Sequence, residues 1–276
     1  MKILFNRIKN NKILCIIGLV SILILIYILC RNNFVKNFEN NNIPKVIHKV
    51  LIQDDGKIPK NLDKNIKDAH NSWKEMNPDY KIIYWSLNDC REYLKNNFPS
   101  SHLESFDCIQ AYANKCDFFR YCIIYNEGGW YSDWKQICLV KNLLNNIGDN
   151  KNFVYFFDNG WDYSIKNKCI QNGFFGSIPK HPILKKCIDI VINNVKNKFY
   201  GKNGLEPTGP YVLGTSIKDN NINVNNKNYF QNNYFYHNKL GKIIQHKCNK
   251  CGEGQNWKNG NNYNKLWDDR KYYCND

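Results

Sequence analysis

From residue 43 onward, short apolar runs alternate with amphipathic stretches along the chain. The apolar runs have the length of buried strands, and the stretches between them repeat their apolar residues at helical spacing. A chain that alternates in this way folds as successive βαβ units. We therefore expect one α/β domain over residues 43–276, with a Rossmann-type, mostly parallel sheet flanked by helices. The aromatic content of 14% argues against a disordered or collagen-like chain.

Individual strands and helices can be placed from this pattern. The expected strands are rich in Ile, Val and aromatic residues and cover 45–52, 80–84, 130–131 and 153–157. The expected helices carry apolar residues at helical spacing and cover 61–76, 87–97, 111–126 and 182–199. Gly128 and Gly129 follow the third of these helices and are expected to end it.

An uninterrupted apolar segment, residues 13–30, precedes this domain. Its eighteen residues carry no charge, and as a helix they would span roughly 27 Å, close to the thickness of a bilayer core. A buried helix of a soluble protein would show a polar face, and a cleaved signal peptide would show a small-residue cleavage site. The segment shows neither. Its basic N-terminal flank predicts a cytosolic tail (1–12), a transmembrane signal anchor (13–30), a stem (31–42) and a type II topology, with the domain in a Golgi- or ER-like lumen.

Ten of the twelve cysteines follow the apolar segment. In a secretory lumen this number predicts disulfides, and we expect two or three, because several cysteines lie inside apolar runs where a free thiol packs well. Near the C-terminus, His246, Cys248 and Cys251 form an H-x-C-x-x-C cluster that Cys274 could complete as a zinc site. We favour disulfides or packing for these cysteines, since zinc fingers usually contain two separated pairs.

The chain is basic, with a formal net charge of +15. A nucleic-acid-binding protein would explain such a charge. The basic residues are scattered along the chain, however, and the predicted topology places the domain away from cytosolic DNA and RNA, so we expect no nucleic-acid partner. The charge suits the attraction of anionic nucleotides or membrane headgroups.

The stretch 116–135 carries the clearest chemical pattern. Asp117 and Arg120 are three residues apart on the expected helix and therefore share one of its faces. Asp133 comes at the end of the strand that follows, where α/β sheets place their ligands. Taken singly, the first two would form a surface ion pair and the third would be a turn aspartate.

The spacing in this stretch follows a known pattern, approximately A-x-x-S-D-x-x-R-Y-x-x-L-x-x-x-G-G-x-Y-x-D-x-D. The matching residues are Ala113, Asp117, Arg120, Tyr121, Gly128, Gly129, Tyr131 and Asp133. Further blocks agree at 43–48, 72–85, 172–182 and 208–210. Over about residues 43–215 the chain thus resembles the DXD-motif glycosyltransferase family that includes fungal initiating α-1,6-mannosyltransferases, inositol-phosphoceramide mannosyltransferases and capsular-polysaccharide transferases.

This resemblance implies a GT-A-like fold and the transfer of a hexose of the mannose, galactose or glucose type. The donor would be a nucleotide diphosphate sugar and the acceptor a glycan, lipid or protein, with retention of configuration. By carry-over, Asp117 accepts hydrogen bonds from the donor sugar, Arg120 holds that carboxylate or the diphosphate, and Asp133 faces the diphosphate or its metal. The other residues that the pattern or their position assigns to substrate binding are Gly128, Gly129, Tyr131, His48 and Asp158.

One position departs from the family pattern. The second aspartate of the DXD motif is absent, and the triplet reads Asp133-Trp134-Lys135. In the family the two carboxylates hold a divalent cation, commonly Mn²⁺, which a charged lysine cannot ligate. Three alternatives follow: Asp133 binds the metal with His246, the Lys135 ammonium replaces the cation in catalysis, or catalysis is lost and a membrane-anchored sugar- or nucleotide-sugar-binding protein remains. The enzymatic alternatives require the carboxylates of Asp117 and Asp133 to converge beside a common pocket.

Overall fold

The computed structural model of the protein describes residues 42–159, 169–219, 227–248 and 261–274, all within one compact unit, Asn42–Asp276. The predicted cytosolic tail, the predicted anchor and nearly all of the predicted stem lie outside the described residues. Within the described ranges, no helix combines the length and the apolar character that a bilayer crossing requires.

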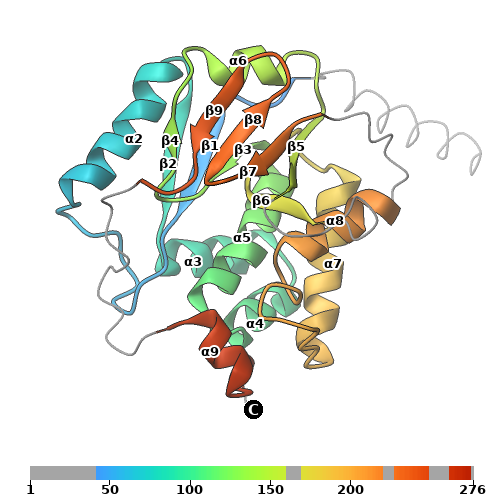
Figure 1. The fold of residues 1–276 in the computed structure, drawn as a ribbon. Helices are drawn as coiled ribbons and strands as arrows, with labels where there is room; N and C mark the ends of the chain where they lie inside the picture. The colour runs from blue at the N-terminus through green and yellow to red at the C-terminus, as the bar shows by residue number, and fades with distance from the viewer. Residues whose placement is uncertain (1–41, 160–168, 220–226, 249–260, 275–276) are drawn as a thin grey trace, which may run out of the picture. The chain divides into compact units, whose positions relative to one another are not determined.

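The described residues form a nine-stranded sheet with the strand order β2-β1-β3-β6-β5-β7-β8-β9-β4 (Figure 1). The strands are β1 (Val46–Val50), β2 (Lys81–Trp85), β3 (Gly129–Ser132), β4 (Ile137–Cys138), β5 (Phe153–Asp158), β6 (Ile170–Ser177), β7 (Tyr229–Gln231), β8 (Tyr234–His237) and β9 (Gly241–Gln245). The helices are α2 (Lys64–Met76), α3 (Leu87–Asn97), α4 (Ser100–Cys108), α5 (Tyr112–Glu127), α6 (Leu143–Gly148), α7 (Pro182–Lys196), α8 (Pro210–Asp219) and α9 (Tyr263–Asp268).

The predicted α/β class is confirmed, but the prediction of a mostly parallel sheet is wrong. Only β1 with β2, β1 with β3, and β5 with β7 pair in parallel, and the other pairs are antiparallel. The central strand β6 runs antiparallel between β3 and β5. Asn232 and Asn233, both at positive φ, then turn β7 back into β8 as a hairpin, which is necessarily antiparallel.

The strands and helices placed from the sequence are all present, with ends that shift by a few residues. α3 has the predicted bounds, and its first turn is closed by a capping box between Ser86 and Asp89. α5 ends where Gly128, at a φ of 69°, leaves the helix. α7 begins with Pro182 in its first turn, where the missing N–H of proline is not needed.

The two faces of the sheet carry different helices. Successive residues of a strand point to opposite faces. Tyr131 of β3 packs on Phe175 in the core formed with α5 and α7, whereas Trp130 packs on Phe174 and the glycine of α6. α5 is buried over most of its length, between the sheet and α7. A polar residue on such a helix must find a partner inside the protein.

Disulfides hold the C-terminal part of the chain. Cys108, at the end of α4, is bonded to Cys274, 166 residues away, and Cys248 is also disulfide-bonded. These bonds agree with the predicted number and with the preference for disulfides over zinc, since Cys274 cannot serve as a zinc ligand while it is bonded to Cys108. Across the described ranges, no three His, Cys, Asp or Glu side chains gather as a metal site.

A single methyl group at Gly129 is expected to be strongly destabilising. This residue has a φ of +95°, and a Cβ there would lie 2.4 Å from Val46 Cγ1 and 2.7 Å from the Val46 carbonyl oxygen. We expect Gly129→Ala to lower the free energy of unfolding by about 3 kcal/mol or more. Gly241→Ala is the matched control: its φ is +69°, but no atom lies within 4 Å of the added Cβ. Its cost should be about 1 kcal/mol. Equal losses in chemical denaturation would contradict this account of β3.

Candidate functional site

Arg120 of α5 lies between the two carboxylates singled out from the sequence. One terminal nitrogen, Nη2, is 3.1 Å from Asp117 Oδ1, and the other, Nη1, is 3.4 Å from Asp133 Oδ1. Nη1 also donates to the Asn172 carbonyl oxygen at 2.8 Å, and Nε donates to the Cys116 carbonyl oxygen. The guanidinium plane lies 4.2 Å from the centroid of the Tyr131 ring. Asp117 on α5 and Asp133 after β3 therefore meet at one buried cation.

Asp117 is the inner carboxylate of this group. It accepts hydrogen bonds from Asn172 Nδ2 and Thr208 Oγ1, each at 2.9 Å. All of its partners are donors, which suits an ionised carboxylate. Burial raises the pKa of Asp117, while Arg120, Thr208 and Asn172 act to lower it. With its oxygens so enclosed, Asp117 mainly fixes the position of Arg120.

Asp133 is the outer carboxylate. Its side chain is 30% exposed, against 10% for Asp117 and 6% for Arg120. It follows β3 directly, on the face of the sheet that α5 covers, and accepts a hydrogen bond from the Tyr131 hydroxyl at 3.0 Å. A Cβ at Gly173 would lie 2.5 Å from Asp133 Oδ2, so the glycine leaves room for this carboxylate. Asp133 is thus the acidic group of the cluster that a ligand can reach.

A buried lysine supports the turn that carries Asp133. Lys49, on β1, donates from Nζ to Ser132 Oγ at 2.8 Å and to the Asp133 carbonyl oxygen at 3.0 Å. Its Nζ also lies 4.9 Å from the centroid of the Trp73 ring. Burial lowers the pKa of Lys49 to about 7, although Asp133 acts to raise it. The contacts do not depend on the charge, since the neutral amine still donates.

The buried Lys49 should leave a signature in the pH dependence of stability. Above pH 7 the folded protein releases a proton that the unfolded chain keeps up to about pH 10. Unfolding therefore takes up a proton in this window, and stability rises with pH by up to about 1.4 kcal/mol per pH unit. Lys49→Met should remove about 1–2 kcal/mol of the rise between pH 7 and pH 9 in denaturation experiments. Lys95→Met, on the exposed face of α3, is the control; a Lys49→Met slope equal to that of the wild type would refute the prediction.

Gln136 connects this turn to His246. Its Oε1 accepts from Ser132 Oγ at 2.9 Å, while Nε2 donates to the Gly173 carbonyl oxygen and to His246 Nδ1, both at 3.0 Å. The carbonyl can only accept, so the amide orientation is fixed and Nδ1 of His246 is an acceptor. Burial lowers the pKa of His246, which is therefore neutral and carries its proton on Nε2.

These residues do not by themselves form a site for the expected divalent cation. The predicted pair is close, with His246 Nδ1 3.9 Å from Asp133 Oδ2. That nitrogen, however, already accepts a hydrogen bond from Gln136, and Arg120 and Tyr131 contact the other Asp133 oxygen. A hard cation prefers several oxygen ligands, and here the second carboxylate of the motif is a lysine. Asp133 and His246 are thus in contact, but their donor set does not fit Mn²⁺.

The other residues predicted for the site lie around this cluster or away from it. Tyr131 belongs to it. Lys135 is partly exposed, in the turn after Trp134. Asp158, at the end of β5, accepts from Gln171, whose Oε1 accepts from the Gly173 backbone N–H.

His48 and the two glycines occupy structural positions. His48 is buried and accepts a hydrogen bond from the Trp85 indole at 3.1 Å. Gly128 and Gly129 pack against Pro44, Val46 and Pro179 where β3 begins. Asp133 comes four positions after Gly129, which corresponds to roughly 13 Å along a strand. These three residues do not join the Asp117–Arg120–Asp133 cluster.

Sequence reasoning did not predict the supporting roles of the residues that hold the cluster in place: Lys49, Ser132, Gln136, Asn172 and Thr208. From the sequence, Lys49 is identified only as a residue that could approach a nucleotide. Asn172 and Thr208 stand in blocks that already matched the family, so their positions were visible although their roles were not. Ser132 and Gln136 flank the DXD position and carry no signal of their own. The supporting roles of all five residues arise only when β1, β6 and the segment after β9 pack around β3.

Residues 63–154 match the model of the family described as "Glycosyltransferase sugar-binding region containing DXD motif". An uncharacterized glycosyltransferase of Acanthamoeba polyphaga mimivirus is 36% identical over 143 residues, 51% of this chain and 52% of the relative. Inositol phosphoceramide mannosyltransferase 2 of Schizosaccharomyces pombe is 26% identical over 155 residues, 56% of this chain and 40% of the relative. A mannosyl phosphorylinositol ceramide synthase of Saccharomyces cerevisiae is 26% identical over 183 residues, 64% and 42% of the two chains.

The matched region spans about half the length of these relatives, or less. Among solved structures, the PaToxG glycosyltransferase aligns with a TM-score of 0.48 at 19% identity, over 70% of this chain and 76% of the other. The family-matched region contains α2, α5 and β3, and so it contains Asp117, Arg120 and Asp133. The resemblance expected from the sequence is confirmed over residues 63–154, which are similar to the sugar-binding region of the DXD-motif glycosyltransferases.

Proposed function

We propose that the protein is a GT-A-like glycosyltransferase that moves a hexose from a nucleotide diphosphate sugar to a hydroxyl group of a glycan, lipid or protein. One observation carries this proposal. Within the family-matched region, Asp117 and Asp133 converge on Arg120 at the carboxyl end of β3, with Asp133 reachable by a ligand.

Asp133 would contact the donor sugar in this proposal. Its carboxylate accepts hydrogen bonds, and sugar hydroxyls are donors that can fill its remaining lone pairs. Arg120 orients this carboxylate through its ion pair, and Asp117 contacts the other end of the same guanidinium. Two carboxylates and one guanidinium leave this cluster with a net negative charge, which suits hydroxyl groups better than a diphosphate.

The diphosphate would therefore be met by a cation outside this cluster, and we assign that role to Lys135. It stands at the same end of β3, two residues beyond Asp133. An ammonium group near the leaving phosphate stabilises the charge that develops as the glycosidic bond breaks. This assignment follows from the mismatch between the residues around Asp133 and a divalent cation.

Acceptor and location are also part of the proposal. Relatives named as inositol phosphoceramide mannosyltransferases favour mannose as the donor sugar and a lipid as the acceptor. Retention of configuration comes from the family resemblance. The apolar segment 13–30 and the disulfides at Cys108, Cys248 and Cys274 support a type II membrane protein whose domain faces a secretory lumen.

A donor panel tests this function directly. The purified protein is incubated with nucleotide sugars carrying mannose, galactose or glucose, with and without EDTA, and released UDP or GDP is measured. The proposal predicts release from at least one donor, and release that persists in EDTA. A protein that binds a nucleotide sugar but never releases the nucleoside diphosphate, with any acceptor offered, would instead be a sugar-nucleotide-binding protein.

A further inference from the structure

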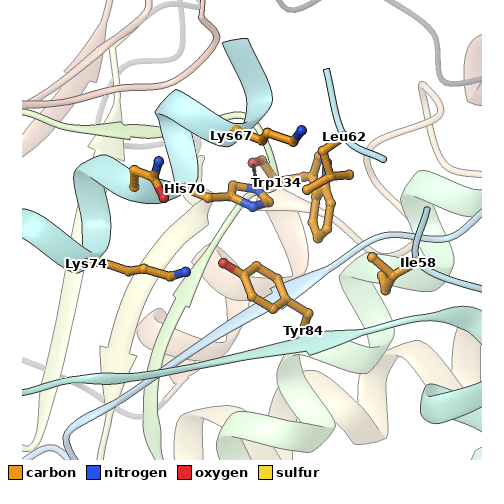
Figure 2. A pocket seen from close by; sticks show the side chains of 8 residues that line it. Ile58, Leu62, Lys67, His70, Lys74, Tyr84 and Trp134 are labelled. Atoms are coloured by element: carbon orange, nitrogen blue, oxygen red, sulfur yellow. Dashed lines mark hydrogen bonds between the residues drawn. The ribbon is translucent and has the colours of Figure 1, made fainter. Parts of the chain in front are cut away.

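A pocket lies on the opposite side of the Asp133 turn from Arg120. It has a volume of about 280 Å³ and opens between α2, β2 and the segment after β1 (Figure 2). The residues that line it are Ile58, Leu62, Lys67, His70, Asn71, Lys74, Tyr84 and Trp134. None of these residues belongs to the Asp117–Arg120–Asp133 cluster or its supporting contacts, but Trp134 follows Asp133 directly in the chain.

Trp134 lies both in the wall of the pocket and in the turn that carries Asp133. The alternation of β3 continues past its end, so Asp133 faces α5 while Trp134 faces α2. The backbone oxygen of Trp134 accepts a hydrogen bond from His70 Nε2 at 3.0 Å. Burial lowers the pKa of His70 to about 3, so the ring is neutral and its Nε2–H donates. This contact holds the Trp134 backbone against α2, and the Trp134 side chain lines the pocket.

Three aromatic rings form the inner surface of the pocket. His70 lies 5.1 Å from Tyr84 and 4.5 Å from Trp134 between ring centroids, and Tyr84 lies 5.6 Å from Trp134. Ile58 and Leu62 add an apolar edge. Aromatic and aliphatic surfaces of this kind pack against the C–H faces of a sugar or cyclic polyol.

The Trp134 indole carries an unused donor. The residue is 6% exposed, and its Nε1–H has no hydrogen-bond partner among the residues that the structure describes. By contrast, Trp73 Nε1 donates to the Gln136 carbonyl oxygen and Trp85 Nε1 donates to His48. A buried donor without a partner costs about 1–3 kcal/mol. The nitrogen is itself covered by protein atoms, so the pocket offers a ligand the face of the Trp134 ring and not this donor.

The mouth of the pocket is cationic. Lys67 and Lys74 extend from α2 on either side of His70 (Figure 2). Asn71 adds an amide, and the lining contains no Asp or Glu. Two ammonium groups seven residues apart on one helix face can both reach a single anionic group. A phosphate, with about two charges and three acceptor oxygens, matches them better than a carboxylate.

We propose that this pocket binds a sugar or cyclic polyol that carries a phosphate group. The ring would pack on Trp134 and Tyr84, and the phosphate would lie between Lys67 and Lys74. The volume is just below the range of about 300–1,000 Å³ typical of ligand pockets, which suits one ring with its phosphate better than a whole nucleotide sugar. Binding at this pocket does not depend on the proposed transfer reaction. Only the use of the pocket for a phosphorylated acceptor headgroup rests on the proposed function.

Titration calorimetry on the full-length protein, without any nucleotide sugar, tests the site. The soluble probes are glucose 1-phosphate, myo-inositol 1-phosphate, glucose and inorganic phosphate, and a second arm uses phosphatidylcholine vesicles with and without phosphatidylinositol. We expect at least one phosphorylated ring, free or on vesicles, to bind at least tenfold more tightly than glucose or inorganic phosphate. Lys67→Gln/Lys74→Gln should weaken that binding at least tenfold, and Lys95→Gln, on exposed α3, should leave it unchanged.

Trp134→Phe replaces the indole with a smaller ring and so reduces the aromatic surface of the pocket. It should weaken the same probe several-fold while the thermal unfolding midpoint stays close to that of the wild type. The proposal would be overturned if no phosphorylated ring bound. It would also be overturned if the Lys67→Gln/Lys74→Gln variant bound the probe as tightly as the wild type. Because no donor is present, that failure is distinct from a failure to release UDP or GDP in the donor panel.

Discussion

Arg120→Leu is expected to lower the free energy of unfolding by about 3–5 kcal/mol and to abolish measurable donor turnover. The substitution leaves the buried carboxylate of Asp117 and the partly exposed carboxylate of Asp133 without the cation that both contact, at 3.1 and 3.4 Å. It also leaves the Asn172 and Cys116 carbonyl oxygens without their donor. Chemical denaturation and nucleoside diphosphate release measure the two effects.

Two controls separate this result from the loss of any arginine. Arg91 pairs with Asp107 at the surface, where its side chain is 48% exposed, so Arg91→Leu should cost less than about 1 kcal/mol. Arg120→Lys keeps the charge but lacks the planar fork that reaches both carboxylates, and it should recover stability only in part. If Arg120→Leu were no more destabilising than Arg91→Leu, the cluster would not be held by its central cation.

Asp133→Asn is expected to reduce donor turnover by about 100-fold or more while changing stability little. The side chain is 30% exposed, and the amide oxygen of asparagine can still accept from the Tyr131 hydroxyl. The substitution removes the negative charge of the carboxylate that would contact the donor sugar. Steady-state turnover with the accepted nucleotide sugar measures the effect, and denaturation shows whether the fold is retained.

Asp117→Asn is the matched comparison, because it removes the inner carboxylate of the same cluster. Its new amide group would face donors from Asn172 and Thr208, so at least one hydrogen bond must break. We expect this variant to lose both stability, by about 1–3 kcal/mol, and turnover. A stable Asp133→Asn variant with wild-type turnover would remove Asp133 from the reaction.

The sequence predicted the elements whose apolar periodicity is visible locally, such as α3 and α5. It did not predict β6, because IQNGFFGS mixes polar residues and glycines with its aromatic residues although the whole strand is buried. Missing an antiparallel strand between β3 and β5 led to the wrong prediction of a mostly parallel sheet. Strand direction depends on long-range pairing, which no local pattern records.

The same distinction holds for the site. Asp117, Arg120 and Asp133 could be found because their spacing matches a family pattern within one stretch of chain. The roles of Lys49 and Gln136 could not, since each is created by contacts with residues distant in sequence. The pocket at Trp134 combines α2, β2 and the turn that carries Asp133, and these elements meet only in the folded protein.

The central claim is that the carboxylates meeting at Arg120 receive the sugar of a nucleotide donor. The most direct measurement is a crystal structure of the protein with the nucleotide sugar that it accepts in the donor panel. The account predicts a hexose hydroxyl within hydrogen-bond distance of the Asp133 carboxylate, with Arg120 still bridging Asp117 and Asp133. A hexose bound elsewhere, with Asp133 free of contact to the donor, would contradict it.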